Sequence, residues 1–170
     1  WGLAYHPAHI AGLQVFFQAL ANHNPLVRLF DLPPDQIHQA IKDQGVTHLS
    51  ATPTFYNLLC NAEQFHPQVR NVTSGGELSH QALRDRMALT FPNARIQNIY
   101  ASTEAGSLLV SSGDSFQVPQ AYHGRIKVIE DELMIHRSLL AASLQSNRAG
   151  EFFRTGDHVQ VLDTNPLTFR

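Results

Sequence analysis

The apolar residues of the first hundred positions follow two alternating patterns. Some segments place apolar residues three and four positions apart, as a helix does, and others are short apolar runs typical of strands. The dipeptide Thr52-Pro53 predicts the N-cap and first position of a helix. Three successive strand–helix units favour an α/β fold with a mainly parallel, helix-flanked sheet over roughly residues 1–105. We expect helices over residues 13–21 (largely buried), from Pro33 to Gly45, from Pro53 and from Ser79, and strands over residues 26–30, 46–51, 69–73 and 94–100.

The second part of the chain has a different pattern. After about residue 105 the helical spacing fades and short strand patterns replace it, which predicts a β-rich, barrel-like portion. We therefore divide the chain into an α/β subdomain, residues 1–112, and a β-rich subdomain, residues 113–170. The strands expected after residue 105 cover residues 107–111, 124–130, 132–136, 151–154 and 158–162.

The composition is that of a folded protein without affinity for polyanions. Hydrophobic residues make up 43% of the 170 residues and charged residues 15%, against about 25% charged in an average domain. A formal net charge of -2 gives no electrostatic footprint for nucleic acid or an anionic membrane. The sequence has no run of about 18 apolar residues and no signal peptide, and its single cysteine, Cys60, is typical of a reducing compartment. These features predict a cytoplasmic protein with no membrane span.

Several common catalytic signatures are absent from the sequence. It contains no Gly-x-x-x-x-Gly-Lys-Ser/Thr phosphate loop, no Gly-x-Gly-x-x-Gly fingerprint, no His-Glu-x-x-His and no Gly-x-Ser-x-Gly elbow. The ten histidines are scattered, and His6 with His9 is the only close pair, so the ligand spacing of a zinc site is missing. Phosphate-loop, dinucleotide, zinc-protease and α/β-hydrolase functions are therefore not indicated.

Three polar segments follow predicted strands, where parallel sheets bind their ligands. Residues 73–78 place two glycines where the backbone can approach a flat ligand closely. Residues 98–106 carry a tyrosine able to stack on a base, two hydroxyls suited to a phosphate and a carboxylate suited to Mg²⁺. Residues 153–157 end in Thr-Gly-Asp, whose aspartate can accept hydrogen bonds from two ribose hydroxyls. Taken singly, the segments are also consistent with a strand-to-helix turn, a cap for a short helix starting near Ser102, and a tight turn.

In this order, the three segments resemble the motifs of the adenylate-forming (AMP-binding) superfamily, of the acyl-CoA and aryl-CoA synthetase type. The family has Ser-Gly-Gly-x-x-Leu, then Tyr-Gly-x-Thr-Glu about 20 residues later, then Thr-Gly-Asp, and Ala101 replaces its second-motif glycine here. The resemblance implies that Thr103 and Glu104 are catalytic, with Thr103 at the phosphate and Glu104 holding Mg²⁺. The implied nucleotide-binding residues are Gly75, Gly76 and Glu77 beside the adenine, Tyr100 stacked on it, Ala101, Ser102 and Thr103 after it, and Asp157 at the ribose hydroxyls.

A fourth segment is similar to the acid-binding region of the family. Residues 9–13 match its His-x-x-Gly-Leu, which implies that His9 and Ala101 line the acyl-substrate pocket; the alternative is a helix-start histidine facing solvent. No aspartate is present there to pair with an amino-acid ammonium, which favours a small fatty or aromatic acid. The resemblance implies attack of this acid on the α-phosphorus of ATP with release of pyrophosphate, and then transfer of the acyl group to coenzyme A as the expected acceptor.

Two cationic elements of the family match no segment of the sequence. One is the lysine-bearing phosphate loop expected upstream of His9, and the other is the C-terminal domain with the catalytic lysine, expected beyond Arg170. The resemblance therefore implies a central fragment of the large N-terminal domain, inactive alone, whose partners are the missing flanking subdomains. Two alternatives stay open: a non-catalytic α/β nucleotide-binding or interaction module, and an unrelated hydrolase using Ser102 or Ser74 with a histidine.

Overall fold

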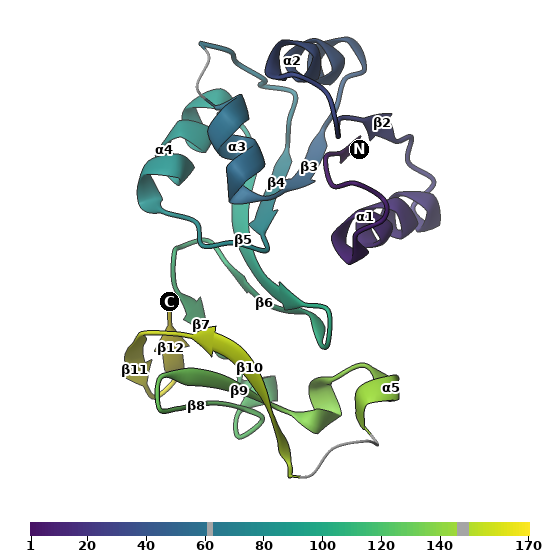
Figure 1. The fold of residues 1–170 in the computed structure, drawn as a ribbon. Coiled ribbons are helices and arrows are strands. Elements are labelled where there is room, and N and C mark those ends of the chain that lie inside the picture. The colour runs from purple at the N-terminus through teal and green to yellow at the C-terminus, as the bar shows by residue number, and fades with distance from the viewer. Residues whose placement is uncertain (61–62, 146–149) are drawn as a thin grey trace. The chain divides into compact units, whose positions relative to one another are not determined.

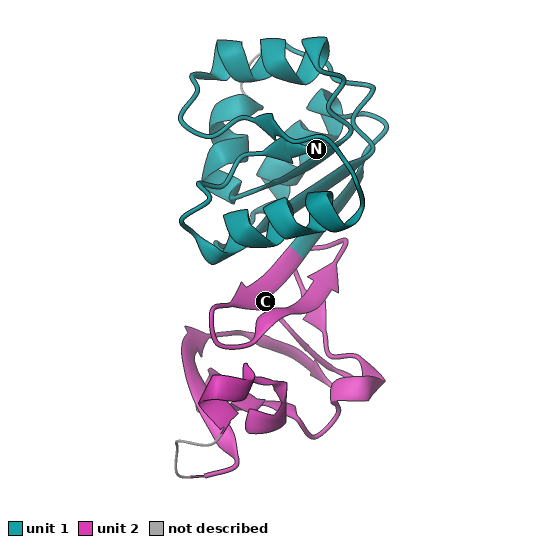
Figure 2. Ribbon diagram, turned by 90° about the vertical axis from the view of Figure 1, so that its right-hand side faces the viewer, with its two compact units in different colours: residues 1–98 teal, residues 99–170 magenta. Residues whose placement is uncertain are grey.

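The computed structural model describes residues 1–60, 63–145 and 150–170 and divides the chain into two compact units. Unit 1 is Trp1–Asn98 and unit 2 is Ile99–Arg170 (Figure 2). This division falls inside strand β5, Arg95–Ser102. The boundary expected from the sequence, after residue 112, instead follows the end of strand β6, Gly106–Ser111. The boundary in the structure reflects which residues contact one another. The boundary expected from the sequence reflects where the helical spacing of apolar residues gives way to strand patterns.

A sheet with helices in its connections organises the first part of the fold. Its strand order is β2-β1-β3-β4-β5-β6, and the pairs β1–β2, β1–β3 and β3–β4 are parallel. Figure 1 shows α1 on one side of these strands and α3 and α4 on the other. The mainly parallel, helix-flanked sheet predicted from the sequence is confirmed. Its elements up to β5 are β1 Gly2–Leu3, α1 Ile10–Ala21, β2 Val27–Arg28, α2 Pro34–Asp43, β3 His48–Ala51, α3 Pro53–Leu59, β4 Asn71–Gly75 and α4 Gln81–Thr90.

Helix α3 is the element that connects the core of unit 1 to the end of β4. The Thr52 hydroxyl accepts a hydrogen bond from the Phe55 amide at 3.1 Å, so the predicted N-cap is confirmed. Tyr56 is fully buried and meets Phe91 edge to face, with ring centroids 6.3 Å apart. Its hydroxyl donates to the backbone oxygen of Thr73 at 3.0 Å. These contacts hold the strand just before the glycine pair.

The prediction that the first helix is largely buried is wrong. Of the twelve residues of α1, those that are buried are Gly12, Val15 and Ala19. Phe17 and Leu20 are 59% and 58% exposed. Gln14 and Gln18 are the polar residues of this helix, and two polar residues are too few to define a full outer face, so hydrophobicity alone does not show which residues face the core.

Unit 2 is built largely from antiparallel strands. One sheet has the order β10-β9-β8 and the other β11-β12-β7, and the pairs β10–β9, β8–β9, β11–β12 and β12–β7 are antiparallel. The β-rich second part predicted from the sequence is confirmed. The two strands expected over residues 151–154 and 158–162 correspond to β10, which continues to His158, and β11, which begins at Val161. The elements are β7 Phe116–Gln117, η1 Gln120–Tyr122, β8 Ile126–Ile129, β9 Glu132–His136, η2 Arg137–Leu139, α5 Ala142–Gln145, β10 Phe152–His158, β11 Val161–Thr164 and β12 Leu167–Phe169.

The helices of the described residues are short or mixed in polarity. None of them has both the length and the hydropathy needed to cross a membrane.

Candidate functional site

The glycine pair at the end of β4 forms an open bend. Gly75 is buried and closes the strand, and Gly76 follows with φ +85°, a conformation that side chains rarely adopt. A Cβ built on Gly76 would meet no atom within 4 Å, so the backbone there is uncovered in unit 1. The hydroxyl of Tyr5 donates to the Gly75 oxygen at 3.3 Å. Tyr5 therefore holds the backbone at Gly75, while the backbone at Gly76 is accessible to a flat ligand.

Tyr5 contacts the glycine segment, although no motif of the sequence points to it. Burial raises the pKa of its hydroxyl to about 12; a hydrogen bond from Ser50 lowers the pKa, and the charge of Glu77 adds to the increase. The hydroxyl therefore stays protonated at neutral pH and remains a donor to Gly75. Tyr5 lies 70 positions before Gly75, and no local motif links the two residues.

Glu77 caps helix α3. Its Oε2 accepts hydrogen bonds from the Thr54 amide at 3.1 Å and from the Thr54 hydroxyl at 2.6 Å. Thr54 belongs to the first turn of α3, where backbone amides lack partners within the helix and a negative charge is favourable. The adenine-facing role assigned to Glu77 stays a prediction, and the structure adds this capping contact to it.

Replacing Glu77 by Ala is expected to lower the free energy of unfolding by about 1 kcal/mol, because the first turn of α3 loses its acceptor. Urea unfolding followed by circular dichroism measures this loss. In a double-mutant cycle, Thr54→Val should cost less in the Glu77→Ala background than in the parent chain. Strictly additive losses would contradict the capping contact, and Glu151→Ala, at an exposed position, serves as the control.

The second predicted segment continues as a strand and a turn. Strand β5 ends at Ser102, and the Ser102 hydroxyl accepts a hydrogen bond from the Ala105 amide at 3.2 Å before β6 begins at Gly106. The alternative of a short helix starting near Ser102 is therefore wrong, because the hydroxyl caps a turn between two strands. Thr103 is exposed on this turn and Glu104 is half-buried.

The Glu104 carboxylate could serve as a ligand for a magnesium ion. The backbone oxygen of Glu104 accepts a hydrogen bond from the Ala141 amide at 2.7 Å, which fixes the turn that carries the carboxylate. Within the described ranges, no three His, Cys, Asp or Glu side chains cluster in a way that could hold a metal ion. A single carboxylate still fits Mg²⁺, which proteins hold through one or two carboxylates together with phosphate oxygens and water.

Tyr100 and Asp157, predicted from separate motifs, meet in unit 2. The Tyr100 hydroxyl donates to Asp157 Oδ2 at 2.5 Å across 57 positions of sequence. Burial, together with the hydrogen bond and charge of Asp157, holds the pKa of Tyr100 well above its ordinary value. The Tyr100 ring also meets Phe116 and Phe169 edge to face, with centroids 6.2 and 6.4 Å away. The aromatic ring and the carboxylate predicted to hold adenosine are thus brought together.

The Thr-Gly-Asp segment is a bulge inside β10 rather than the expected tight turn. The register of β10 against β9 shifts between Arg154 and His158. Gly156 has φ +79°, and its amide donates to Glu132 Oε1 at 3.0 Å. The Thr155 hydroxyl donates to the Leu133 oxygen at 2.8 Å, and so the strand continues through the motif. A glycine motif is compatible with either a turn or a bulge, and only the partner strand distinguishes them.

His9 is the N-cap residue of α1 and is exposed. Its side chain makes no capping hydrogen bond, and its backbone oxygen accepts from the Leu13 amide at 3.0 Å. His9 and the glycine segment belong to unit 1, while Tyr100 to Glu104 and Asp157 belong to unit 2. The pocket role of His9 and Ala101 stays a prediction.

Comparison with known proteins places the chain in a family. The family model described as AMP-binding enzyme matches residues 3–156. The chain belongs to the AMP-binding enzyme family. A search of curated proteins found no match.

Several solved structures share the fold of this chain. The N-terminal domain of FACL13 from Mycobacterium tuberculosis has a TM-score of 0.74 at 19% identity, over 99% of this chain and 50% of that one. The O-succinylbenzoate coenzyme A synthetase (MenE) from Bacillus subtilis, in complex with ATP and magnesium ion, has a TM-score of 0.72 at 16% identity, over 99% of this chain and 40% of that one. The luciferase-like enzyme from the nonluminescent Zophobas morio mealworm has a TM-score of 0.71 at 16% identity, over 94% of this chain and 45% of that one. The chain therefore spans half or less of the length of these structures.

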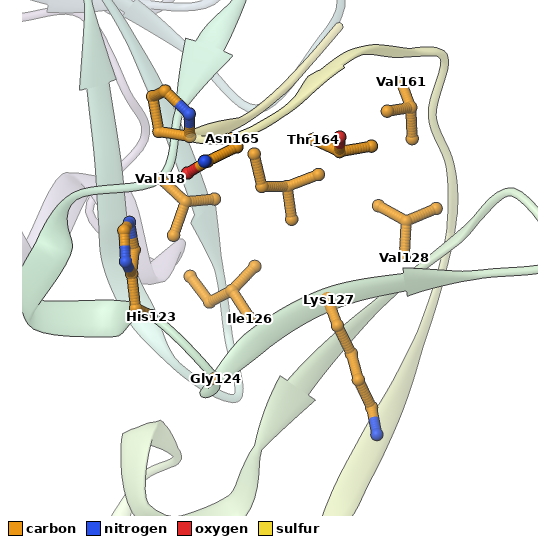
Figure 3. A pocket seen from close by; sticks show the side chains of 11 residues that line it. Val118, His123, Gly124, Ile126, Lys127, Val128, Val161, Thr164 and Asn165 are labelled. Atoms are coloured by element: carbon orange, nitrogen blue, oxygen red, sulfur yellow. The ribbon is translucent and has the colours of Figure 1, made fainter.

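A pocket of about 450 Å³ in unit 2 is separate from the predicted nucleotide residues (Figure 3). It lies beside β8 and the β11–β12 hairpin, and its lining is mostly apolar, with Val118, Ile126 and Val161 among the residues. Lys127 extends away from the other labelled side chains and places Nζ 3.5 Å from the centre of the Phe152 ring. None of the lining residues is one assigned to nucleotide, acid or metal.

Proposed function

We propose that this AMP-binding enzyme carries the adenine- and ribose-binding part of an AMP-forming acid ligase of the acyl-CoA or aryl-CoA synthetase type. The observation that carries the proposal is the hydrogen bond between Tyr100 and Asp157. This hydrogen bond joins the second and third motifs of the family. The Tyr100 ring is suited to stack on a base, and the Asp157 carboxylate is suited to accept hydrogen bonds from hydroxyl groups. Membership of the family and the order of the three motifs support the same function.

The residues of the proposed site have separate tasks. Asp157 accepts hydrogen bonds from the ribose hydroxyls, and Tyr100 provides an aromatic surface for adenine. Gly75 and Gly76 provide a backbone that adenine can approach closely. The Thr103 hydroxyl donates to phosphate, and the Glu104 carboxylate holds Mg²⁺. When bound, Mg²⁺ neutralises charge that develops on the phosphates.

The substrate and acceptor follow from the family resemblance. We propose a small fatty or aromatic carboxylic acid as the substrate, bound beside His9 and Ala101, and coenzyme A as the acceptor of the acyl group. The flanking subdomains of a longer chain would supply the two lysine-bearing elements, and the cytoplasm would supply ATP and coenzyme A. The MenE structure in complex with ATP and magnesium ion supports the choice of nucleotide and metal.

A non-catalytic nucleotide-binding module is the second candidate. It would bind nucleotide without turnover even with flanking subdomains present, and the two lysines of this chain fit it as well as they fit a ligase. Lys42 lies in the last turn of α2, and Lys127 lies over the Phe152 ring, so both are outside the segments assigned to nucleotide.

Replacing Asp157 by Asn is expected to weaken AMP binding about 10- to 100-fold, because hydrogen bonds to a carboxylate lose their charge assistance. Isothermal titration of the 170-residue chain with AMP measures the change. Asp114→Asn removes a half-buried carboxylate of the same unit that pairs with Arg170, outside the assigned nucleotide residues, and should bind AMP as the parent does. Equal affinities of the parent chain and Asp157→Asn would contradict the assignment of Asp157 to the ribose.

A further inference from the structure

Glu132 is a buried carboxylate that no motif assigned to the site predicts. It begins strand β9, and the whole residue is 6% exposed. The other polar residues buried in the described part of the chain are histidine, serine, threonine and asparagine. An ionised side chain is rarely buried without partners, because its desolvation costs several kcal/mol. The contacts of Glu132 therefore indicate what its burial serves.

Both oxygens of the Glu132 carboxylate bind strand β10. Oε2 accepts from Arg154 Nε at 2.7 Å and also from Arg154 Nη2. Oε1 accepts from the Gly156 amide at 3.0 Å. The side chain of Arg154 is 68% exposed, whereas that of Glu132 is 8% exposed. An ion pair with so exposed an arginine adds little stability by itself, so the contact that distinguishes Glu132 is the one to the bulge.

A chain of hydrogen bonds leads from Glu132 to Asp157. The Glu132 carboxylate holds the amide of Gly156, whose φ of +79° turns the backbone inside the bulge. The Thr155 hydroxyl donates to the Leu133 oxygen at 2.8 Å and accepts from the Asp157 amide at 3.0 Å. Asp157 in turn accepts from the Tyr100 hydroxyl. The backbone on either side of Gly156 is thus fixed to β9, and Asp157 extends from it.

We propose that Glu132 is a positioning residue for nucleotide binding: its carboxylate holds the bulge at Gly156 and so sets the direction in which Asp157 presents its oxygens. The inference rests on the proposed function, because it assigns Glu132 a task at the same ribose site. Glu132 does not touch the ribose in this arrangement and acts through Gly156 and Asp157. Arg154 keeps the carboxylate ionised, since its hydrogen bond lowers the pKa of Glu132.

Glu132→Gln is the variant that tests the proposal. It keeps the volume of the side chain but replaces one carboxylate oxygen by an amide group and removes the charge. We expect AMP binding at least about tenfold weaker than that of the parent, the size of effect seen when a group that orients a ligand-binding side chain is removed. Glu151→Gln makes the same change at an exposed position and should bind AMP as the parent does.

Nuclear magnetic resonance provides a readout that does not depend on nucleotide. In the parent, the Gly156 amide proton should shift downfield and titrate together with the Glu132 carboxylate; in Glu132→Gln this titration should vanish. The Tyr100 hydroxyl should titrate at lower pH in the variant, because Asp157 no longer holds it. If either the Tyr100 titration or the AMP affinity of Glu132→Gln equals that of the parent, the positioning role is overturned.

The two proposals fail in different ways. If the parent does not bind AMP, the proposed function fails, and the Gly156 and Tyr100 titrations alone decide whether Glu132 positions Asp157. If Asp157→Asn loses AMP binding but Glu132→Gln does not, the function stands and the positioning role is overturned. Should Glu132→Gln fail to fold, Arg154→Gln tests the same contact, because it removes the exposed partner of the Glu132 carboxylate. The pKa of Glu132 should then rise, and AMP binding by this variant should weaken as the pH falls. Binding by Arg154→Gln that follows the parent at every pH would overturn the role.

Discussion

The 170-residue chain, supplied with ATP, Mg²⁺ and a panel of small fatty and aromatic acids, is expected to exchange labelled pyrophosphate into ATP about four orders of magnitude more slowly than a complete adenylate-forming ligase. The reaction develops negative charge on phosphate, and each group that stabilises such charge only in the transition state contributes about 100- to 1000-fold. Glu104 and Thr103 would remain, but two cationic groups would be lacking.

The positions of the lysines support this expectation. The sequence contains two of them, and neither belongs to the glycine segment, the Tyr100–Glu104 segment or the Thr-Gly-Asp bulge. Lys42 lies in the last turn of α2, and the Lys127 ammonium lies over the Phe152 ring. No lysine of this chain is therefore assigned to the transferred phosphate.

The exchange assay also separates the two candidate functions. A complete ligase assayed with its own acid is the positive control, and Glu104→Gln is the negative control for the metal-dependent background. Exchange by the parent chain within about tenfold of the complete ligase would contradict the proposal that additional cationic elements are needed. AMP binding without exchange, even after the phosphate loop and the lysine domain of a related ligase are joined to the chain, would favour the non-catalytic module.

Acidification from pH 7 to pH 4 is expected to destabilise unit 1 by about 3 kcal/mol through a buried histidine pair. His38 on α2 and His66 are 6% and 2% exposed, and their Nδ1 and Nε2 atoms lie 2.8 Å apart. Their rings are stacked, with centroids 5.1 Å apart, and His66 also stacks on Phe91. Phe91 also meets Tyr56 of the core, and both histidines are buried, so a positive charge on the pair is poorly solvated.

The direction of the effect follows from the pKa values. Burial, with the charges of His38 and Lys42, lowers the pKa of His66 from 6.5 to about 4. Burial lowers the pKa of His38 too, against an opposing hydrogen bond and the charge of Asp35. Between pH 6.5 and pH 4 the unfolded chain therefore binds more protons than the folded one. The stabilisation is fully present above about pH 6.5 and is lost as the pH falls towards 4.

Urea unfolding at a series of pH values measures this loss. His66→Gln removes the titrating ring but retains a polar side chain for His38, so the stability of this variant should depend less on pH. His123→Gln replaces an exposed histidine of unit 2 and should leave the pH dependence unchanged. A parent chain equally stable at pH 7 and pH 4.5 would show that the pair is protonated without cost.

The helix and strand assignments succeeded where neighbouring residues decide the structure. Thr52-Pro53 begins α3 as predicted, because the cap contact joins residues three positions apart. The prediction for α1 was wrong about burial, since Phe17 and Leu20 have the same hydrophobicity as core residues but face outward. The Thr-Gly-Asp segment was placed at the right residues but in the wrong structure, because a bulge depends on the register with β9.

Local patterns of residue type predict the alternation of strands and helices in the first part, the β-rich second part and the order of the three motifs. These properties depend on residue type and on spacings of a few positions, which local physical chemistry governs. The hydrogen bonds of Tyr100 with Asp157, of Glu132 with Gly156 and of His38 with His66 exist only once the chain is folded. Those pairs are 57, 24 and 28 positions apart. Contacts over such separations are set by how strands pair and helices pack, and a local pattern carries no information about them.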